Sequence, residues 1–341
     1  MLNKVYRLVH PRQFELVFRD EPLDGEKVIV RPDYLSICNA DQRYYQGTRD
    51  IRVLREKLPM ALIHEGIGQV VYDKSGSFNP GDRVVMVPNI PVEDDPFIAE
   101  NYLRSSKFCG SSADGFLQEY VCIEPERLVL LPEGLDPDVA AFTELVSVSV
   151  HAITRFEKIA HERRDHIGVW GDGNLAFITA LLLKKMLPKS RIHVFGISRE
   201  KLSDFSFADG TYLTTDVPDD LRLDHAFECV GGNGSPIAIE QIIGLIRPEG
   251  TISILGVSEY PVNVNTRMIL EKGLRMFGTS RSGKADFRRT VQLYRDYPEI
   301  PMYLSRLVGN TVEINTYPDI KRAFEIDTKK AFGKTILHWN I

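Results

Sequence analysis

Short apolar runs, broken by glycine and proline, fill about the first 140 residues of the chain. Examples are 27–31 (KVIVR), 68–72 (GQVVY) and 83–87 (RVVMV). Runs of this length with turn residues between them are typical of β-strands. Their close spacing leaves no room for crossover helices, so it favours a barrel-like β unit over a parallel sheet. We therefore predict a β-rich domain over residues 1–147.

The pattern changes near residue 135, where apolar residues begin to recur at helical spacing. Beyond residue 165, strands and helices alternate, which predicts a doubly wound parallel sheet and an α/β fold over 148–283. The expected strands are 166–170, 191–195, 223–228, 250–255 and 274–278, and the expected helices are 175–186, 237–246 and 266–272. Residues 284–341 are expected to complete the first domain, with 333–338 as an edge strand.

Composition narrows the class of protein. The 341 residues carry a formal net charge of -5. The chain therefore lacks the excess of positive charge that is typical of proteins that bind nucleic acid. The longest apolar run, 175–183, is about half of the roughly 20 residues that a membrane span needs. The N-terminus lacks the layout of a signal peptide, and four widely separated cysteines do not form a disulfide framework. We expect a cytoplasmic protein in a reducing compartment.

A dinucleotide fingerprint lies between the first strand and the first helix of the alternating region. Residues 171–176 read G-D-G-N-L-A, the alanine form of G-x-G-x-x-G. Gly171 permits a tight turn, and Gly173 lets the backbone approach a pyrophosphate. Asn174 and Leu175 then open a helix whose free N–H groups attract phosphate. A plain glycine turn is the alternative, and the surrounding alternation argues against it.

The residues after the second strand indicate which nicotinamide cofactor binds. An NAD site usually has Asp or Glu there, to bind the ribose hydroxyls. This chain instead has Ser198, Arg199 and Lys201, which can hydrogen-bond and neutralise a ribose phosphate. We therefore predict NADP(H). The alternative is that Arg199 and Lys201 are ordinary solvated charges at a helix start.

Four residues, Cys38, His64, Glu65 and Glu144, are candidate metal ligands. Each has a simpler explanation: a small buried thiol, a core imidazole or a solvated carboxylate. Glu144, however, lies in the apolar segment 142–146 (FTELV), where an unpaired buried carboxylate would be unfavourable. Mixed sulfur, nitrogen and oxygen donors suit a catalytic zinc ion.

These motifs resemble the zinc-dependent medium-chain dehydrogenase/reductase family. Its C-x-x-D, G-H-E-x-x-G and G-D-R-V elements match 38–41, 63–68 and 81–84, with Ile63 replacing the leading glycine. The resemblance implies a GroES-like catalytic domain joined to a Rossmann domain. It also implies one catalytic zinc held by Cys38, His64 and Glu144, with Glu65 as a fourth ligand or behind the ligands.

Two departures from the family pattern change what the resemblance implies. Residues 92–114 contain only Cys109, so we expect no structural zinc. Many relatives have a hydroxyl residue two positions after the metal cysteine, to relay the alcohol proton. Ala40 stands there in this chain, so Glu65, metal-bound water or substrate hydroxyls must replace that relay.

Segments such as 38–45 (CNADQRYY) and 225–232 (HAFECVGG) resemble the ribitol-5-phosphate 2-dehydrogenases more closely. That resemblance implies NADPH-driven reduction of D-ribulose 5-phosphate, a sugar phosphate, for CDP-ribitol and wall teichoic acid. It also implies a homodimer, a complex with a ribitol-phosphate cytidylyltransferase, or both. Arg43, Tyr44 and Arg281 are candidates to bind the substrate, although the arginines also suit surface ion pairs. A dehydrogenase of an unphosphorylated polyol and a non-catalytic binding protein are the alternatives.

Overall fold

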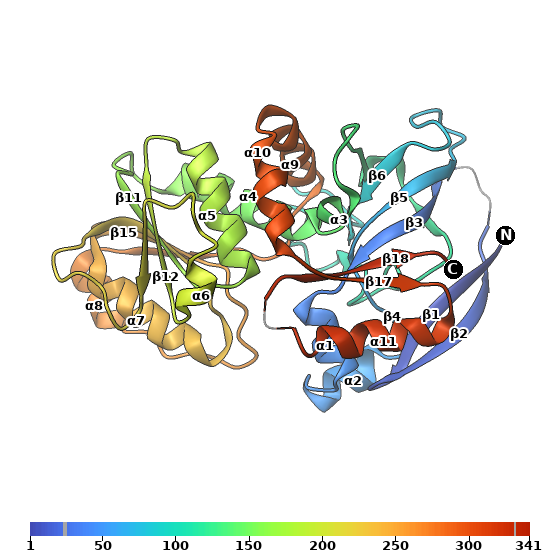
Figure 1. Ribbon diagram of the computed structural model, residues 1–341, viewed down its shortest axis with the longest axis horizontal. Coiled ribbons are helices and arrows are strands. Elements are labelled where there is room, and N and C mark those ends of the chain that lie inside the picture. The colour runs from blue at the N-terminus through green and yellow to red at the C-terminus, as the bar shows by residue number, and fades with distance from the viewer. Residues whose placement is uncertain (23–25, 331) are drawn as a thin grey trace. The chain divides into compact units, whose positions relative to one another are not determined.

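The computed structural model describes residues 1–22, 26–330 and 332–341, which form two units (Figure 1). One unit contains Met1–Ser147 and Ser282–Ile341, and the other is Val148–Arg281. The apolar pattern predicted a second domain that ends at residue 283. Ser282 instead belongs to the first unit, where its Oγ lies 2.7 Å from Oγ of Ser147. Among the described residues, no helix has both the length and the apolar character to cross a membrane.

A seven-stranded sheet is the framework of the first unit. Its strands run in the order β10-β6-β5-β3-β18-β17, and β9 pairs with β3 beside this path. Their bounds are β3 Val28–Ser36, β5 Glu65–Tyr72, β6 Arg83–Met86, β9 Val121–Ile123, β10 Leu128–Leu130, β17 Val308–Ile314 and β18 Lys334–Trp339. The prediction that 333–338 forms an edge strand is wrong, because β18 pairs on one side with β3 and on the other with β17.

Two smaller sheets and several helices surround this framework. The strands are β1 Leu2–His10, β2 Gln13–Asp20 and β4 Met60–Ala61 in one sheet, and β7 Asn89–Ile90 and β8 Lys107–Phe108 in the other. The helices are α1 Asn39–Tyr45, α2 Ile51–Lys57, α3 Pro137–Ala140, α9 Lys284–Asp296, α10 Glu299–Leu304 and α11 Tyr317–Asp327, with short 3-10 turns at Pro125–Arg127 and Ser305–Leu307. Helix α4, Thr143–Ile159, begins in the first unit and continues into the second.

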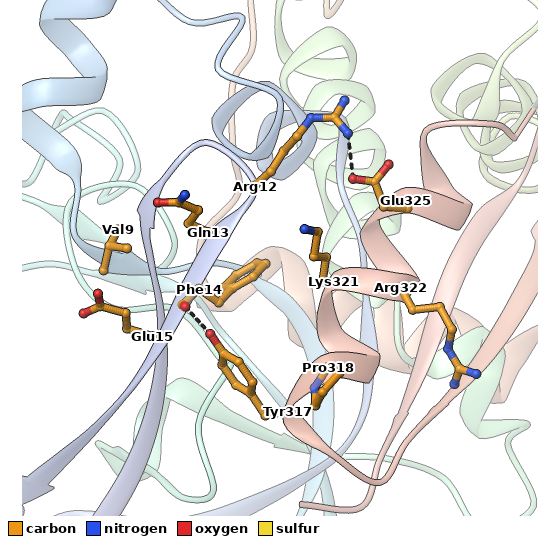
Figure 2. Close-up of a pocket in the computed structure, with 10 residues that line it drawn as sticks. All are labelled: Val9, Arg12, Gln13, Phe14, Glu15, Tyr317, Pro318, Lys321, Arg322 and Glu325. Carbon is orange, nitrogen blue, oxygen red and sulfur yellow. Dashed lines mark hydrogen bonds and ion pairs between the residues drawn. The ribbon is translucent and has the colours of Figure 1, made fainter.

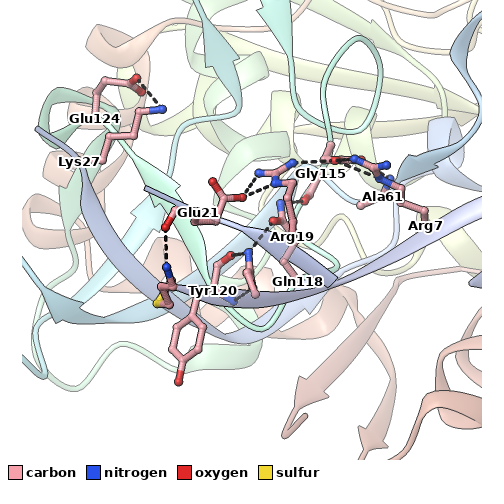
Figure 3. Close-up of polar contacts among 12 residues, drawn as sticks. Arg7, Arg19, Glu21, Lys27, Ala61, Gly115, Gln118, Tyr120 and Glu124 are labelled. Atoms are coloured by element: carbon pink, nitrogen blue, oxygen red, sulfur yellow. Dashed lines mark hydrogen bonds and ion pairs between the residues drawn. The ribbon is translucent and has the colours of Figure 1, made fainter. Parts of the chain in front are cut away.

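Asp114 links three parts of the first unit. Its carboxylate accepts hydrogen bonds from Arg7 at 2.6 Å, from Arg19 at 3.0 Å and from the backbone N–H of Ala61 at 2.9 Å. Figure 3 shows Arg7 and Arg19 side by side, with Arg19 also paired to Glu21. The 92–114 segment is therefore tied to β1 and β2 by charge-assisted hydrogen bonds.

The second unit is a six-stranded parallel sheet with the strand order β13-β12-β11-β14-β15-β16. This is the Rossmann order, in which the order of the strands across the sheet reverses between β11 and β14. Strand bounds are β11 His166–Trp170, β12 Arg191–Gly196, β13 Gly210–Leu213, β14 Leu223–Glu228, β15 Ile246–Ile254 and β16 Arg275–Gly278. The helices are α5 Asn174–Met186, α6 Arg199–Leu202, α7 Ser235–Leu245 and α8 Thr266–Lys272, with a 3-10 turn at Gly232–Gly234.

The alternating region thus forms the α/β fold predicted for it. α5 and α6 pack on β11, β12 and β13, whereas α7 and α8 pack on β14 and β15. The core of the unit is apolar and fully buried, with Trp170 stacked on Phe195 at a ring distance of 4.0 Å. Strands buried on both faces read as continuous apolar runs, which is why the sequence located most of them.

Candidate functional site

Asp41 connects two of the three segments that carry the candidate metal ligands. One of its carboxylate oxygens accepts the backbone N–H of Cys38 at 3.0 Å, which fixes the turn into α1. The other accepts the backbone N–H of Ile63 at 2.9 Å, immediately before His64. Asp41 is fully buried, and this burial raises its pKa, although both hydrogen bonds act in the opposite direction and favour the charged form. The D of C-x-x-D is therefore the residue that brings Cys38 and His64 into one place.

The backbone at Ile63 explains why the family pattern has glycine at this position. Ile63 has a φ of 69°, in the left-handed region that a β-branched residue rarely adopts. The side chain is nonetheless fully buried. Burial of the isoleucine side chain offsets a backbone strain of about 1–2 kcal/mol.

Cys38, His64 and Glu65 converge in the described structure. Sγ of Cys38, a ring nitrogen of His64 and a carboxylate oxygen of Glu65 all lie within 4.8 Å of one another. His64 and Glu65 are buried, and Nδ1 of His64 has no hydrogen-bond partner among the described residues, with Asp41 Oδ1 at 3.9 Å. Thiolate, imidazole and carboxylate are the donors that zinc takes in proteins, so the chemistry of this group fits that ion.

Lys334 is a site residue that the sequence analysis missed. It lies at the start of β18, and its ammonium contacts both oxygens of Glu65, at 2.9 and 2.8 Å. Ser36 Oγ donates a further hydrogen bond to Glu65 at 2.8 Å. Burial would raise the pKa of Glu65, but Lys334 and His64 outweigh it and hold that pKa below its usual value. Glu65 is therefore a charged, fully partnered carboxylate.

Glu144, near the start of α4, has a different environment. It is buried, yet its carboxylate forms no hydrogen bond within the described ranges, and it lies outside the group of three mutually close ligands. Burial, together with repulsion from Glu65, raises its pKa to about 7 despite attraction by His64. Burial would lower the pKa of His64, but Asp41, Cys38 and Glu144 raise it to about 10. The cluster thus favours a positive charge at its centre.

The glycine-rich fingerprint forms the turn between β11 and α5. Gly171 has a φ of 126°, and a Cβ there would meet the side chain of Ala176 at 3.2 Å and the backbone of Cys229 at 3.3 Å. Gly173 is the N-cap of α5, and nothing lies within 4 Å of the position where its Cβ would be. Asn174 and Leu175 form the first helical positions. The turn therefore offers an open backbone surface at a helix N-terminus, which suits a pyrophosphate.

Asp172, within the fingerprint, orients the segment after β12. Its carboxylate accepts the backbone N–H groups of Ile197 and Ser198, at 2.8 and 2.9 Å. Ser198 in turn caps α6 by accepting the N–H of Lys201 at 3.3 Å. Arg199 is exposed and lies 3.8 Å from Asp216, also exposed. The segment with Ser198, Arg199 and Lys201 thus follows β12 at the same end of the sheet as the fingerprint. Asp172 connects this segment to the fingerprint and was not among the predicted site residues.

The three candidate substrate residues lie in different units. Arg43 and Tyr44 are on α1 in the first unit, where Tyr44 is buried and Arg49 lies over its ring at 4.9 Å. Arg281 is the last residue of the second unit and has a φ of 61°. Each remains a prediction.

A groove between β2 and α11 is a cavity of about 660 Å³ that contains none of the predicted site residues. Figure 2 shows Arg12 paired with Glu325, and the Tyr317 hydroxyl donating to the backbone carbonyl of Phe14. The described lining of the groove includes the carboxylates of Glu15 and Glu325 but no cysteine, no histidine and no glycine-rich phosphate loop. The candidate active-site chemistry therefore lies in the Cys38 cluster and the Gly171 turn.

Comparison with known proteins identifies the family. The ribulose-5-phosphate reductase of Bacillus spizizenii is 55% identical over 341 residues, covering all of both chains. The chain belongs to the ribulose-5-phosphate reductase family. A second reductase of this family, ribulose-5-phosphate reductase 1 of Staphylococcus aureus, is 54% identical over 99% of each chain.

The domain matches and a solved structure agree with membership of the reductase family. Residues 24–133 match the alcohol dehydrogenase GroES-like domain, and residues 214–296 match the zinc-binding dehydrogenase model. The structure is similar to the crystal structure of S. aureus TarJ in complex with NADPH, with a TM-score of 0.90 and 49% sequence identity. The match covers the whole of both chains. The predicted fold, a GroES-like domain with a Rossmann domain, is confirmed.

Proposed function

We propose that this chain reduces D-ribulose 5-phosphate to D-ribitol 5-phosphate with NADPH, and that the product serves CDP-ribitol and poly(ribitol phosphate) wall teichoic acid synthesis. The observation that carries this proposal is the 55% identity to a ribulose-5-phosphate reductase over the whole of both chains. The NADPH bound to TarJ supports the cofactor, as do Ser198, Arg199 and Lys201 after β12.

The proposal includes one catalytic zinc held by Cys38, His64 and Glu144, with Glu65 behind the ligands. Glu65 is already bound by Lys334 and Ser36, whereas Glu144 is a buried residue whose carboxylate accepts no hydrogen bond from the described residues. A buried carboxylate in that state is stabilised by a cation. When bound, zinc polarises a ketone oxygen and NADPH supplies hydride.

The protein residues hold this chemistry in place. Asp41 fixes the backbone at Cys38 and Ile63, and Nδ1 of His64 faces Asp41, which leaves Nε2 as the donor for a metal. Lys334 keeps Glu65 ionised, so the cluster retains its negative charge. Because Ala40 has no hydroxyl, the proton for the new alcohol has to come from a group other than this side chain.

Metal analysis separates the two roles of the carboxylates. Glu144→Gln is expected to lower the zinc content of the purified protein strongly, because a neutral amide is a poor zinc donor. Glu65→Gln, the matched control, is expected to keep most of the zinc. Cys38→Ala is expected to lose zinc as well. Full zinc in Glu144→Gln together with loss in Glu65→Gln would reverse the assignment.

The activity test compares substrates that differ in the phosphate. NADPH consumption is measured with D-ribulose 5-phosphate, D-ribulose and fructose, before and after chelation. We expect turnover only with the phosphorylated ketose. We also expect this turnover to be lost when chelation removes the metal. Equal turnover with the free sugars would favour a dehydrogenase of an unphosphorylated polyol and remove the phosphate requirement.

Arg43 and Arg281 are proposed to bind the substrate phosphate, since a guanidinium binds it through two N–H groups. Arg43→Gln is expected to raise KM for D-ribulose 5-phosphate about tenfold or more while the affinity for NADPH stays unchanged. An unchanged KM in both Arg43→Gln and Arg281→Gln would place the phosphate elsewhere.

The homodimer and the cytidylyltransferase complex are also part of the proposal. Light scattering on the eluting protein, alone and mixed with a ribitol-phosphate cytidylyltransferase, measures both. A mass of one chain, about 38.7 kDa, under both conditions would contradict them.

A further inference from the structure

A second cavity, of about 720 Å³, is lined by residues of the Rossmann unit, and half of its lining residues are cationic. Four cationic side chains and one carboxylate face it, along with apolar and glycine residues: Arg163, Arg222, Arg247, Lys272 and Glu249, with Gly244, Ile246 and Pro248. The chain as a whole has a net charge of -5, so a local cluster of four cations is not explained by its overall composition. We call this cavity the arginine pocket.

The arginine pocket is separate from the coenzyme loop. Arg163 precedes β11, Arg222 precedes β14, and Arg247 lies near the start of β15. These positions are at the amino ends of the parallel strands, whereas the Gly171 turn follows the carboxyl end of β11. A strand of six residues, such as β14, separates the two edges by roughly 15–20 Å. A ligand of the pocket is therefore distinct from the coenzyme phosphates.

Hydrogen bonds to the fold hold the arginines of the pocket but use only some of their N–H donors. Asp224, fully buried, accepts Arg163 Nε at 2.8 Å and Arg247 Nη1 at 3.0 Å. Arg222 uses Nη1 on the backbone carbonyls of Asp219 and Leu221, at 2.7 and 2.8 Å. Each guanidinium has five N–H donors, so within the described structure most of them are available to a ligand.

Lys272 has a different part in the pocket. Its ammonium donates to three backbone carbonyls at the end of α7, those of Ile243, Gly244 and Ile246, at 2.5, 3.2 and 3.0 Å. It therefore neutralises the negative end of that helix, which would otherwise repel an anion. Burial and, to a smaller extent, the nearby charge of Arg222 lower the pKa of Lys272.

We propose that the arginine pocket binds a small phosphate-containing anion that carries at least two negative charges. The four cations outnumber the two nearby carboxylates, Asp224 and Glu249, so an excess of positive charge remains, and each guanidinium can bind phosphate through two N–H groups. The lining has no aromatic side chain on which a base could stack, so recognition rests on the phosphates. The cavity volume is within the range of small-molecule sites. The inference does not depend on the proposed reductase activity.

The test uses calorimetric titration of the full-length chain with inorganic pyrophosphate, in the presence of saturating NADPH so that the coenzyme loop is occupied. Binding is expected, tighter than that of orthophosphate and weakened by salt. Arg222→Glu is expected to weaken it at least roughly tenfold, because this side chain holds only exposed carbonyls and its loss leaves Asp224 paired.

The matched control is Arg267→Glu, an exposed arginine on α8 outside the lining, which is expected to leave the affinity within about twofold. Arg247→Gln is a second variant of the pocket. In this variant, Asp224 still accepts the hydrogen bond from Arg163. Absence of pyrophosphate binding, or equal binding by Arg222→Glu and the unaltered chain, would overturn the proposal. So would binding of an acidic peptide in place of pyrophosphate, which would make the pocket a protein docking face.

Discussion

Replacing Lys334 by methionine tests how the charges of the metal site are balanced. Lys334 is 3% exposed and Glu65 is 0% exposed, so the substitution leaves a carboxylate buried with Ser36 as its remaining donor. Removing one partner of a buried ion pair costs about 3–5 kcal/mol. For a unit of about 200 residues, each kcal/mol lowers Tm by roughly 2–4 °C. The expected decrease is therefore about 6–20 °C.

The measurement is denaturant and thermal unfolding of the chelator-treated protein, so that loss of metal does not add to the effect. The double variant Lys334→Met/Glu65→Gln is expected to recover at least half of the lost stability, because the uncompensated charge is gone. Lys321→Met, at an exposed lysine on α11, serves as the control and is expected to change stability by less than about 0.5 kcal/mol. A loss below about 1 kcal/mol in Lys334→Met, or no recovery in the double variant, would refute the reasoning.

Three further predictions concern other parts of the molecule. Asp172→Ala is expected to weaken NADPH binding about tenfold, because the segment at Ser198 loses two hydrogen bonds; an unchanged Kd in a fluorescence titration would contradict this. Burial, with help from a neighbouring imidazole, lowers the pKa of His193 to about 4 from an ordinary value of 6.5. As the pH falls, His193 takes up a proton in the unfolded chain before it does so in the folded chain. The contribution of His193 to the free energy of unfolding is therefore fully present above pH 6.5 and decreases by roughly 3 kcal/mol as the pH falls towards 4. In urea unfolding, the free energy of unfolding of His193→Gln should fall less steeply with decreasing pH. Ile63→Gly is expected to cost about 1–2 kcal/mol less than Leu62→Gly, since both side chains are fully buried but only Ile63 has a positive φ, and equal losses would count against strain at Ile63.

The sequence was most informative about the Rossmann unit. Its strands β11 and β14 and its helix α8 have the bounds that the apolar pattern predicted. The pattern missed β13, a four-residue strand at the edge of the sheet whose side chains are only partly buried. It also placed the start of β15 four residues late, because the Pro-Glu-Gly at 248–250 resembles a loop, whereas the structure keeps it inside the strand. Edge and irregular strands lack the continuous burial on which the prediction depends.

The candidate site was predictable only as far as its motifs are local. Cys38 and His64 each lie in a short recognisable motif, and Asp41 joins the two motifs through backbone hydrogen bonds. Lys334 has no such motif and is 269 residues from Glu65. A lysine at the start of a strand usually indicates a solvated end. Only the pairing of β18 with β3 makes this one a buried counter-charge, and that pairing cannot be read from periodicity.

The position of β18 has a consequence for how the chain folds as it is synthesised. The Rossmann unit is one continuous segment and can fold as soon as residue 281 has left the ribosome. The first unit cannot, because β18, which follows the whole Rossmann unit in the chain, lies between β3 and β17. Until it arrives, β3 has an open edge, and Glu65 lacks its counter-charge. The segment made first is therefore completed last, and this interval is when the nascent chain most needs protection from pairing with other strands.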